Sequence, residues 1–306
     1  MPHLLTLRPL SNSSRLGWSN SRYGTFDSCK RRYYYHYYGS KFDTAVPGDF
    51  IWKLKELTSI ALTIGNVTHK TIEALLKRLI TTEIPIDRLR LDEFIRDMVK
   101  DELRQKIFFE VYYGEKSEIS EDEIFTKANE SVINFLESER FAWILEKGVA
   151  EKEKWIIEPP HYGETNIAGI KAYAKFDFLC VDGDEVLIFD WKSGKEHLET
   201  HAFQLRAYSY WASYHMGIKP ESITPVIAYL HPEYSEIECL FDSEQFEEFA
   251  IAVREQTKSM EGYCKDVEAN TPLEKELFPL RSKDGFCERC NFKQLCWGTR
   301  AADTVE

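Results

Sequence analysis

Residues 176–195 read FDFLCVDGDEVLIFDWKSGK, and this stretch decides the fold. Asp182-Gly183 is a strong turn signal between two apolar runs, so the sequence predicts a β-hairpin with an Asp on each arm. If Gly183-Asp184 are the central turn residues, Asp177 lies directly opposite Asp190; if Asp182-Gly183 are central, the two are diagonal neighbours. Both registers place Asp177, Asp190 and Lys192 on one face, because side chains two apart on a strand point the same way.

Two carboxylates so close repel each other and destabilise a hairpin unless a cation compensates. Oxygen ligands of this kind suit Mg²⁺ or Mn²⁺, and Lys192 would then stand beside the metal ion and any water or phosphate bound there. The alternative is a pair of solvated charges on the polar face of an edge hairpin. The run VLIFDW is apolar on both faces, which predicts an interior strand and favours the metal site.

A second cluster of metal-binding type lies near the C-terminus. The stretch GFCERCNFKQLCW, residues 285–297, holds Cys287, Cys290 and Cys296 in the spacing C-x₂-C-x₅-C. In a chain that shows no apolar signal-peptide core, this spacing favours metal binding or redox chemistry over a structural disulfide.

Three weaker patterns complete the set. GNVTH, from Gly65 to His69, opens the apolar helix TIEALLKRLI, where a lone His is usually packed or solvated. In FQLRAYSYWASYHMG, Gln204 and Tyr208 share a face of a predicted helix, as they would in any amphipathic helix. The segment SNSRYGTFDSCKRRYYYHYYGSKF, residues 19–42, places basic residues beside tyrosines that either pack on the core or stack on bases; its basic cluster is Lys30, Arg31 and Arg32.

Together, and in this order along most of the chain, these features resemble the PD-(D/E)XK nuclease superfamily. The similarity is to its RecB-type branch, which includes AddB-like helicase–nucleases and CRISPR-associated exonucleases with an iron–sulfur cluster. The resemblance implies that Asp177, Asp190 and His69 bind Mg²⁺ or Mn²⁺ with the Trp191 backbone carbonyl. It implies that Lys192 acts on the attacking water.

The same resemblance implies that Gln204 and Tyr208 lie beside the active site, where they contact the nucleic-acid strand or support Lys192. It also gives the C-terminal cysteines a fourth ligand in Cys29, although many relatives have a Pro after that Cys where this chain has Lys30. The four thiolates would hold a [4Fe-4S] cluster that ties the chain ends together. A zinc ion bound by the same four thiolates is the alternative.

The expected fold class is α/β, a restriction-endonuclease-like mixed β-sheet core flanked by helices. We expect a single domain over 1–306, a helical insert or cap at 83–147, and a staple formed by 284–297 with Cys29. Helices are predicted at 19–40, 51–80, 89–113, 121–146, 199–216 and 243–264. Strands are predicted at 151–159, 167–181, 185–193, 223–231 and 235–241.

Bulk properties predict a cytoplasmic protein without a membrane segment, because no apolar run approaches 18 residues. A net charge of −12 is unusual for a nucleic-acid binder, but the acidic residues concentrate in stretches such as EKSEISEDEIF that are expected to form an outer surface. The resemblance implies a DNA exonuclease acting on single strands or DNA ends, with a helicase or a CRISPR or defence protein as a partner. The alternatives are a non-catalytic DNA-binding subunit of such a complex and a zinc-stapled protein unrelated to nucleases.

Overall fold

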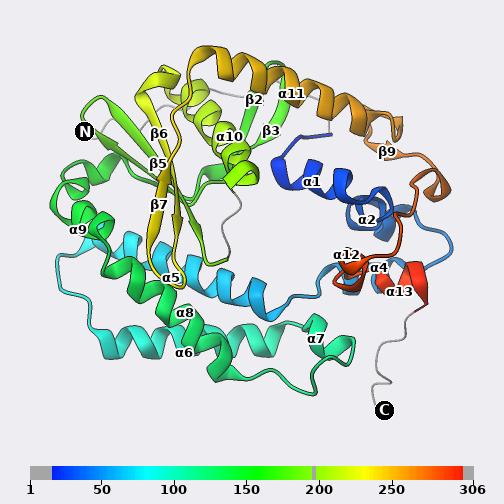
Figure 1. Cartoon of the computed structure of the whole chain (residues 1–306), viewed down its shortest axis with the longest axis horizontal. Helices are drawn as coiled ribbons and strands as arrows, with labels where there is room; N and C mark the ends of the chain where they lie inside the picture. The colour runs from blue at the N-terminus through cyan, green and yellow to red at the C-terminus, as the bar shows by residue number, and fades with distance from the viewer. Residues whose placement is uncertain (1–15, 195–197, 299–306) are drawn as a thin grey trace.

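A mixed five-stranded sheet forms the centre of the computed structural model, which describes residues 16–194 and 198–298 (Figure 1). The strand order is β1-β4-β5-β6-β7, and only the β5–β6 pair is parallel. The strands are β1 (Ile156–Ile157), β4 (Phe178–Asp182), β5 (Glu185–Lys192), β6 (Ile223–Tyr229) and β7 (Ser235–Glu238). The predicted α/β class with a mixed sheet and flanking helices is confirmed.

Strand β5 is the central strand, as its apolar sequence predicts, and is buried on both faces from Val186 to Trp191. The alternation of side chains gives its two faces different neighbours. Ile188 packs toward α10 (Leu198–Met216), whereas Phe189 and Trp191 pack in the core on the opposite face. Asp190 and Lys192 therefore point toward α10.

The hairpin that joins β4 to β5 settles the register left open by the sequence. Asp182 pairs with Glu185, so Gly183-Asp184 are the central turn residues, and Gly183 adopts a φ of 62°. With Phe178 paired to Phe189, Asp177 is opposite Asp190. Asp177 precedes the first residue of β4, yet its amide still donates to the Phe189 carbonyl at 3.1 Å.

Helices cover both faces of the sheet (Figure 1). On one face, α10 makes the crossover between β5 and β6 and packs with α11 (Ser243–Glu261) and the N-terminal helices, as the apolar cluster around Trp211 and Phe249 shows. On the other, α5 (Ile60–Thr81), α8 (Glu121–Leu136) and α9 (Glu139–Glu146) pack through Ile72, Phe135 and Phe141.

The single helix expected over 19–40 is wrong, because the chain breaks at Cys29. Its backbone is extended (φ −164°, ψ 116°), and its sulfur accepts a hydrogen bond from the Arg32 amide at 3.4 Å, so Cys29 caps the next helix. The segment forms α1 (Asn20–Ser28), α2 (Lys30–Tyr34), a π-helical turn η1 (Tyr35–Gly39) and α3 (Ser40–Phe42).

Other predicted elements are also divided. The first hairpin arm, expected over 167–181, contains β3 (Ile170–Tyr173), which pairs instead with β2 (Glu164–Ile167) in a separate two-stranded sheet, and then β4. The strand expected at 151–159 begins with the end of the 3₁₀ helix η2 (Gly148–Lys154) and is a strand only at β1. The helix at 51–80 is α4 (Gly48–Lys55) and α5, and that at 89–113 is α6 (Arg88–Gln105) and α7 (Phe109–Tyr112).

The segment that follows α11 consists of short elements and packs against the N-terminal helices. They are β8 (Cys264–Asp266), β9 (Thr271–Pro272), the 3₁₀ turn η5 (Lys275–Leu277), α12 (Gly285–Glu288) and α13 (Lys293–Trp297). Two further 3₁₀ turns are η3 (Pro160–Gly163) and η4 (Pro220–Ser222). The single-domain limits of 1–306, which extend beyond the described residues, and the insert limits of 83–147 stay predictions. Among the described helices, none combines the length and apolarity needed to cross a membrane.

Candidate active site

The first carboxylate of the candidate site is Asp177. One of its oxygens, Oδ1, lies 3.0 Å from His69 Nδ1 on α5, and the other, Oδ2, accepts a hydrogen bond from the Trp191 amide at 2.7 Å. The His69 side chain is 32% exposed and that of Asp177 is 17% exposed. His69 of α5 and the backbone near the end of β5 thus both contact the Asp177 carboxylate, which retains access to solvent.

The second carboxylate, Asp190, is more deeply buried, with 4% of the residue exposed. Tyr208 donates a hydrogen bond to Asp190 Oδ1 at 2.8 Å, and Gln204 in turn donates to the Tyr208 hydroxyl. Lys192 forms an ion pair with Asp190 Oδ2 and donates to Gln204 Oε1 at 3.4 Å. The structure therefore brings the predicted pairs Asp190–Lys192 and Gln204–Tyr208 into one network.

The two carboxyl groups have opposite electrostatic surroundings. Burial would raise the pKa of Asp177, but the attraction and hydrogen bond of His69 and the Trp191 amide outweigh it, so the pKa lies below its ordinary value. Burial raises the pKa of Asp190, and the Asp177 charge adds to this despite the attraction of Lys192. Burial, followed by the charge of Asp190, also raises the pKa of Tyr208 well above its ordinary value. Neighbouring carboxyl groups whose pKa values are shifted in opposite directions are typical of functional sites.

Helix α5 reaches the site because Gly65 permits close approach. A Cβ at Gly65 would lie 3.3 Å from Ser193 Oγ, directly after the end of β5. His69 follows one helical turn later, on the same side of α5. The sequence singled out GNVTH as a unit, and the structure supplies the physical role of its glycine.

The donor atoms at this site suit a hard divalent cation. They are carboxylate oxygens and an imidazole, and Asp190 Oδ2 is a buried oxygen whose described partner is the Lys192 ammonium. As the side chains of residues 16–194 and 201–298 stand, no three His, Cys, Asp or Glu already form a ready metal-binding group. Trp191 contributes its amide to Asp177, a contact that the sequence analysis missed because backbone groups leave no residue-type signal; a ligand role for its carbonyl stays a prediction.

The basic cluster that follows Cys29 is engaged inside the molecule. Lys30 donates to the Phe26 carbonyl at 2.7 Å, and Arg31 donates to the Phe278 carbonyl at 2.9 Å. The Arg32 guanidinium lies 5.2 Å from the centre of the Phe286 ring. These contacts join the N-terminal helices to the C-terminal segment, and the predicted role of the three residues in nucleic-acid binding stays untested.

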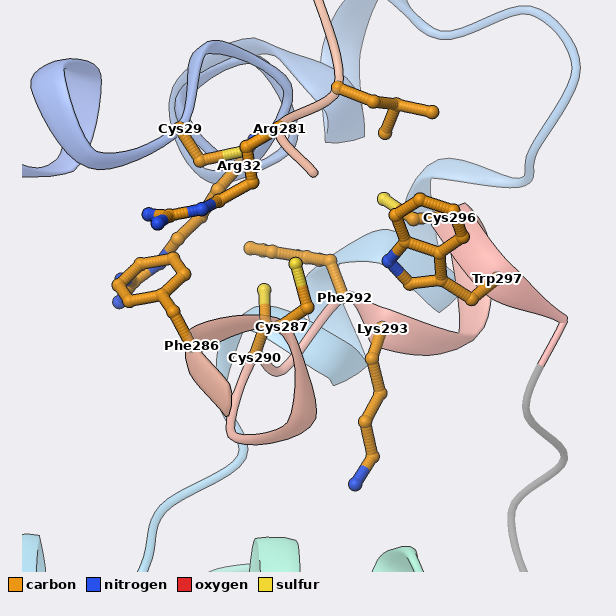
Figure 2. Close-up of a pocket in the computed structure, with 11 residues that line it drawn as sticks. Cys29, Arg32, Arg281, Phe286, Cys287, Cys290, Phe292, Lys293, Cys296 and Trp297 are labelled. Carbon is orange, nitrogen blue, oxygen red and sulfur yellow. The ribbon is translucent and has the colours of Figure 1, made fainter. Parts of the chain in front are cut away.

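The four cysteines singled out in the sequence line one pocket between α2 and the C-terminal segment. Cys29, Cys287, Cys290 and Cys296 surround it together with Arg32 and Phe292, and their sulfurs point toward a common space (Figure 2). None of the four is in a disulfide. Burial and the neighbouring cysteines raise the pKa of Cys290, and in the same order raise that of Cys296 to about 12.

The fold and the site define the protein as an α/β protein with a buried Asp–Asp–Lys arrangement at the end of a central strand. Comparison with known families agrees: residues 17–297 match the PD-(D/E)XK nuclease superfamily, and the chain belongs to that superfamily.

Two other comparisons add little to this assignment. No curated protein matches the chain. A solved structure titled "Crystal structure of SSO0001" is similar over 74% of this chain and 96% of that chain, with 14% sequence identity and a TM-score of 0.30, which is too low to establish a common fold.

Proposed function

We propose that the protein is a metal-dependent nuclease that hydrolyses DNA phosphodiester bonds, acting from an end on single-stranded or end-frayed DNA. Membership of the PD-(D/E)XK superfamily supports nuclease activity with DNA as the substrate. The observation that carries the proposal is the position of Asp177 opposite Asp190, with Lys192 paired to Asp190 on the same face.

Asp177, Asp190 and His69 would hold Mg²⁺ or Mn²⁺. A bound ion of this kind lowers the pKa of a coordinated water and offsets the charge that builds on the phosphate. Asp177 is suited to ligation because its carboxyl group is held ionised by His69 and the Trp191 amide. For Asp190, a cation would relieve the repulsion that Asp177 imposes on it.

The remaining residues orient the reacting groups. The Lys192 ammonium would position the attacking water and stabilise negative charge on the phosphate oxygens. Gln204 holds Lys192 from one side, and the Tyr208 hydroxyl fixes the Asp190 carboxylate from the other. The helix α10 thus acts as a support that keeps the lysine and the carboxylate in place.

Cleavage of end-labelled single- and double-stranded DNA tests this function. The anaerobically purified protein is incubated with Mg²⁺, Mn²⁺ or EDTA, beside Lys192→Ala and the control Lys258→Ala on the exposed face of α11. We expect metal-dependent cleavage by wild type and the control, and a loss of at least 100-fold in Lys192→Ala.

Cleavage that persists in Lys192→Ala would refute the assigned role of the lysine. A folded wild-type protein that binds DNA but does not cleave it would instead support a partner-dependent subunit of a helicase–nuclease or defence complex.

We further propose that Cys29, Cys287, Cys290 and Cys296 hold a [4Fe-4S] cluster. Support comes from the common pocket of the four sulfurs and from the absence of a disulfide at any of the four (Figure 2). Four neighbouring thiols can all ionise only if a bound cation offsets the repulsion between the thiolates. Iron and sulfide analysis of anaerobically purified protein decides the occupant: four irons and visible absorption support the cluster, and one zinc without iron refutes it.

A further inference from the structure

Helix α4 exposes a large aromatic side chain on a short, otherwise well-packed element. Trp52 is 52% exposed, whereas Ile51 and Leu54 are fully buried. Tryptophan is among the residues most enriched at binding surfaces, and its indole is a flat π-face available for stacking. About half of this side chain is therefore open to a binding partner.

Lys55 lies over the indole, and Lys53 of the same helix lies over a different ring. The Lys55 ammonium lies 5.0 Å from the centre of the Trp52 ring, and the Lys53 ammonium lies 5.6 Å from that of Tyr112. Across the described residues, neither lysine forms an ion pair with a carboxylate, although α5, α6 and α8 of this acidic chain carry such pairs. Their charges are therefore available for phosphate groups.

Other cations of this region are already engaged inside the molecule. Burial, followed by the charges of Lys55, Arg32 and Arg22, lowers the pKa of His36 to about 4. Arg22 donates to the Tyr33 hydroxyl at 3.1 Å and to the Gly17 carbonyl at 3.2 Å, and the Arg32 guanidinium lies over the Phe286 ring. The lysines of α4 are therefore the cations of this region that remain for phosphate groups.

Carboxylates near Trp52 restrict how a nucleic-acid strand can lie. Asp49 and Glu56 are exposed and lie about one helical turn before and after Trp52. They would repel phosphates that followed the helix axis. A strand that contacts Trp52 would have to cross α4, with its phosphates near the lysines.

The same helix leads directly to the candidate active site. The short segment after α4 is held by Asn291, which donates to the Leu57 carbonyl at 2.9 Å, and α5 then begins at Ile60. His69 lies about 14 Å further along α5 at 1.5 Å per residue. A strand on α4 would thus lie on the element that precedes, in the chain, the helix carrying His69.

We propose that Trp52, with Lys53 and Lys55, forms a stacking platform that binds an unpaired base of single-stranded DNA outside the candidate active site. The inference rests on the proposed nuclease function and adds the residues that select unpaired DNA. Bases in a duplex are stacked on each other and cannot stack on an indole, whereas aromatic side chains beside cations bind single strands without sequence preference.

Binding without cleavage tests the platform. Fluorescence anisotropy of labelled (dT)₂₀ and of a blunt 20-base-pair duplex is measured on a Lys192→Ala background without added divalent ion. Trp52→Ala is expected to weaken (dT)₂₀ binding about 5- to 100-fold, with little effect on the duplex. Trp52→Phe should retain most of the affinity, and Tyr162→Ala, which removes a side chain 76% exposed in η3, should leave it unchanged.

Charge variants provide a second readout. The double variant Lys53→Ala, Lys55→Ala should reduce the salt dependence of (dT)₂₀ binding. Glu56→Gln should increase the affinity for (dT)₂₀, because phosphates then meet less repulsion. Melting curves identify any variant that has lost its fold.

The outcomes separate the platform from the nuclease function. Unchanged (dT)₂₀ affinity in folded Trp52→Ala overturns the platform even if wild type cleaves DNA. Equal losses on (dT)₂₀ and duplex overturn stacking as the contact. Trp52-dependent (dT)₂₀ binding by a wild type that never cleaves supports the platform and refutes the nuclease.

Discussion

At the residue scale, the candidate site is a chain of hydrogen bonds that starts at Gln204 and ends at Asp190. Gln204 donates to the Tyr208 hydroxyl, which donates to Asp190 Oδ1 at 2.8 Å. Buried polar networks of this kind hold side chains in a single geometry, and the loss of one member leaves others without partners. Tyr208 is thus the residue whose removal best tests the network.

Tyr208→Phe removes only the hydroxyl. We expect a loss of about 1–2 kcal/mol in the free energy of unfolding, since Asp190 and Gln204 lose a buried partner. Cleavage should fall by about tenfold or more through misplacement of the carboxylate. Urea unfolding and steady-state cleavage measure the two effects.

Tyr210→Phe is the matched control, because Tyr210 stacks on Phe246 with ring centres 5.4 Å apart and faces away from this network. Wild-type cleavage by folded Tyr208→Phe would contradict a supporting role for the hydroxyl.

At the element scale, the site depends on the approach of α5 to the end of β5. Helix α5 lies close to Ser193 at Gly65, where a Cβ would stand 3.3 Å from Ser193 Oγ, so a side chain at this position requires its surroundings to shift. Helix α5 also packs against the sheet through Ile72 and Leu76, which fixes the helix beyond His69. The position of His69 thus follows from packing at two points.

Gly65→Leu is expected to displace α5 from β5 and move His69 away from Asp177. Cleavage should fall at least tenfold, while the free energy of unfolding changes little, because leucine gains helix propensity over glycine by about 0.8 kcal/mol. Asn66→Ala, at the next and exposed position, is the control. A Gly65→Leu protein with full activity would show that the close approach is not required.

At the scale of the whole molecule, the segment from α2 to Asp43 is joined to the segment that follows α11. Arg31 binds the Phe278 carbonyl, Tyr35 packs on Phe292 at 5.5 Å between ring centres, and Lys275 donates to both oxygens of Asp43 at 3.1 and 2.9 Å. The cysteine pocket lies in the same contact region. Closing so large a loop costs entropy, which the hydrogen bonds, the ion pair and the ring packing of this region offset in the folded protein.

Cys29→Ala should therefore lower the melting temperature more than Cys239→Ala, which removes a cysteine outside the pocket. The reason is that the proposed cluster binds only the folded protein and stabilises it. Thermal unfolding of anaerobically purified variants measures the difference. Equal melting curves for Cys29→Ala and wild type would contradict a structural cluster.

The Asp43–Lys275 pair should make stability depend on pH. Burial would raise the pKa of Asp43, but the Lys275 and backbone hydrogen bonds outweigh it and hold the pKa below 3.8. The pair is therefore fully stabilising above that ordinary value, and the stabilisation is lost as pH falls through the folded-state pKa.

Asp43→Asn should cost about 1–2 kcal/mol at pH 7 and progressively less below pH 4. Urea unfolding across this range measures it. A difference that stays constant as the pH falls would show that the carboxylate charge is not responsible.

Local patterns in the sequence were sufficient for several parts of the molecule. The turn at Asp182-Gly183 and the apolar run of β5 predicted a hairpin with Asp177 and Asp190 on one face, and the helix over 199–216 matches α10. These features depend on neighbours within a few residues, where turn chemistry and alternation decide the outcome. Cys29 and the C-terminal cysteines were grouped by resemblance, and the structure places them around one pocket.

Only the tertiary structure decided the contacts between distant segments. It chose between the two hairpin registers, divided the 167–181 arm because β3 pairs with β2, and broke the first helix at Cys29. It also placed His69 against Asp177 and bound the basic residues after Cys29 to internal partners. The physical reason is that periodicity reports which face of an element is apolar, whereas packing with elements far along the chain determines what that face meets.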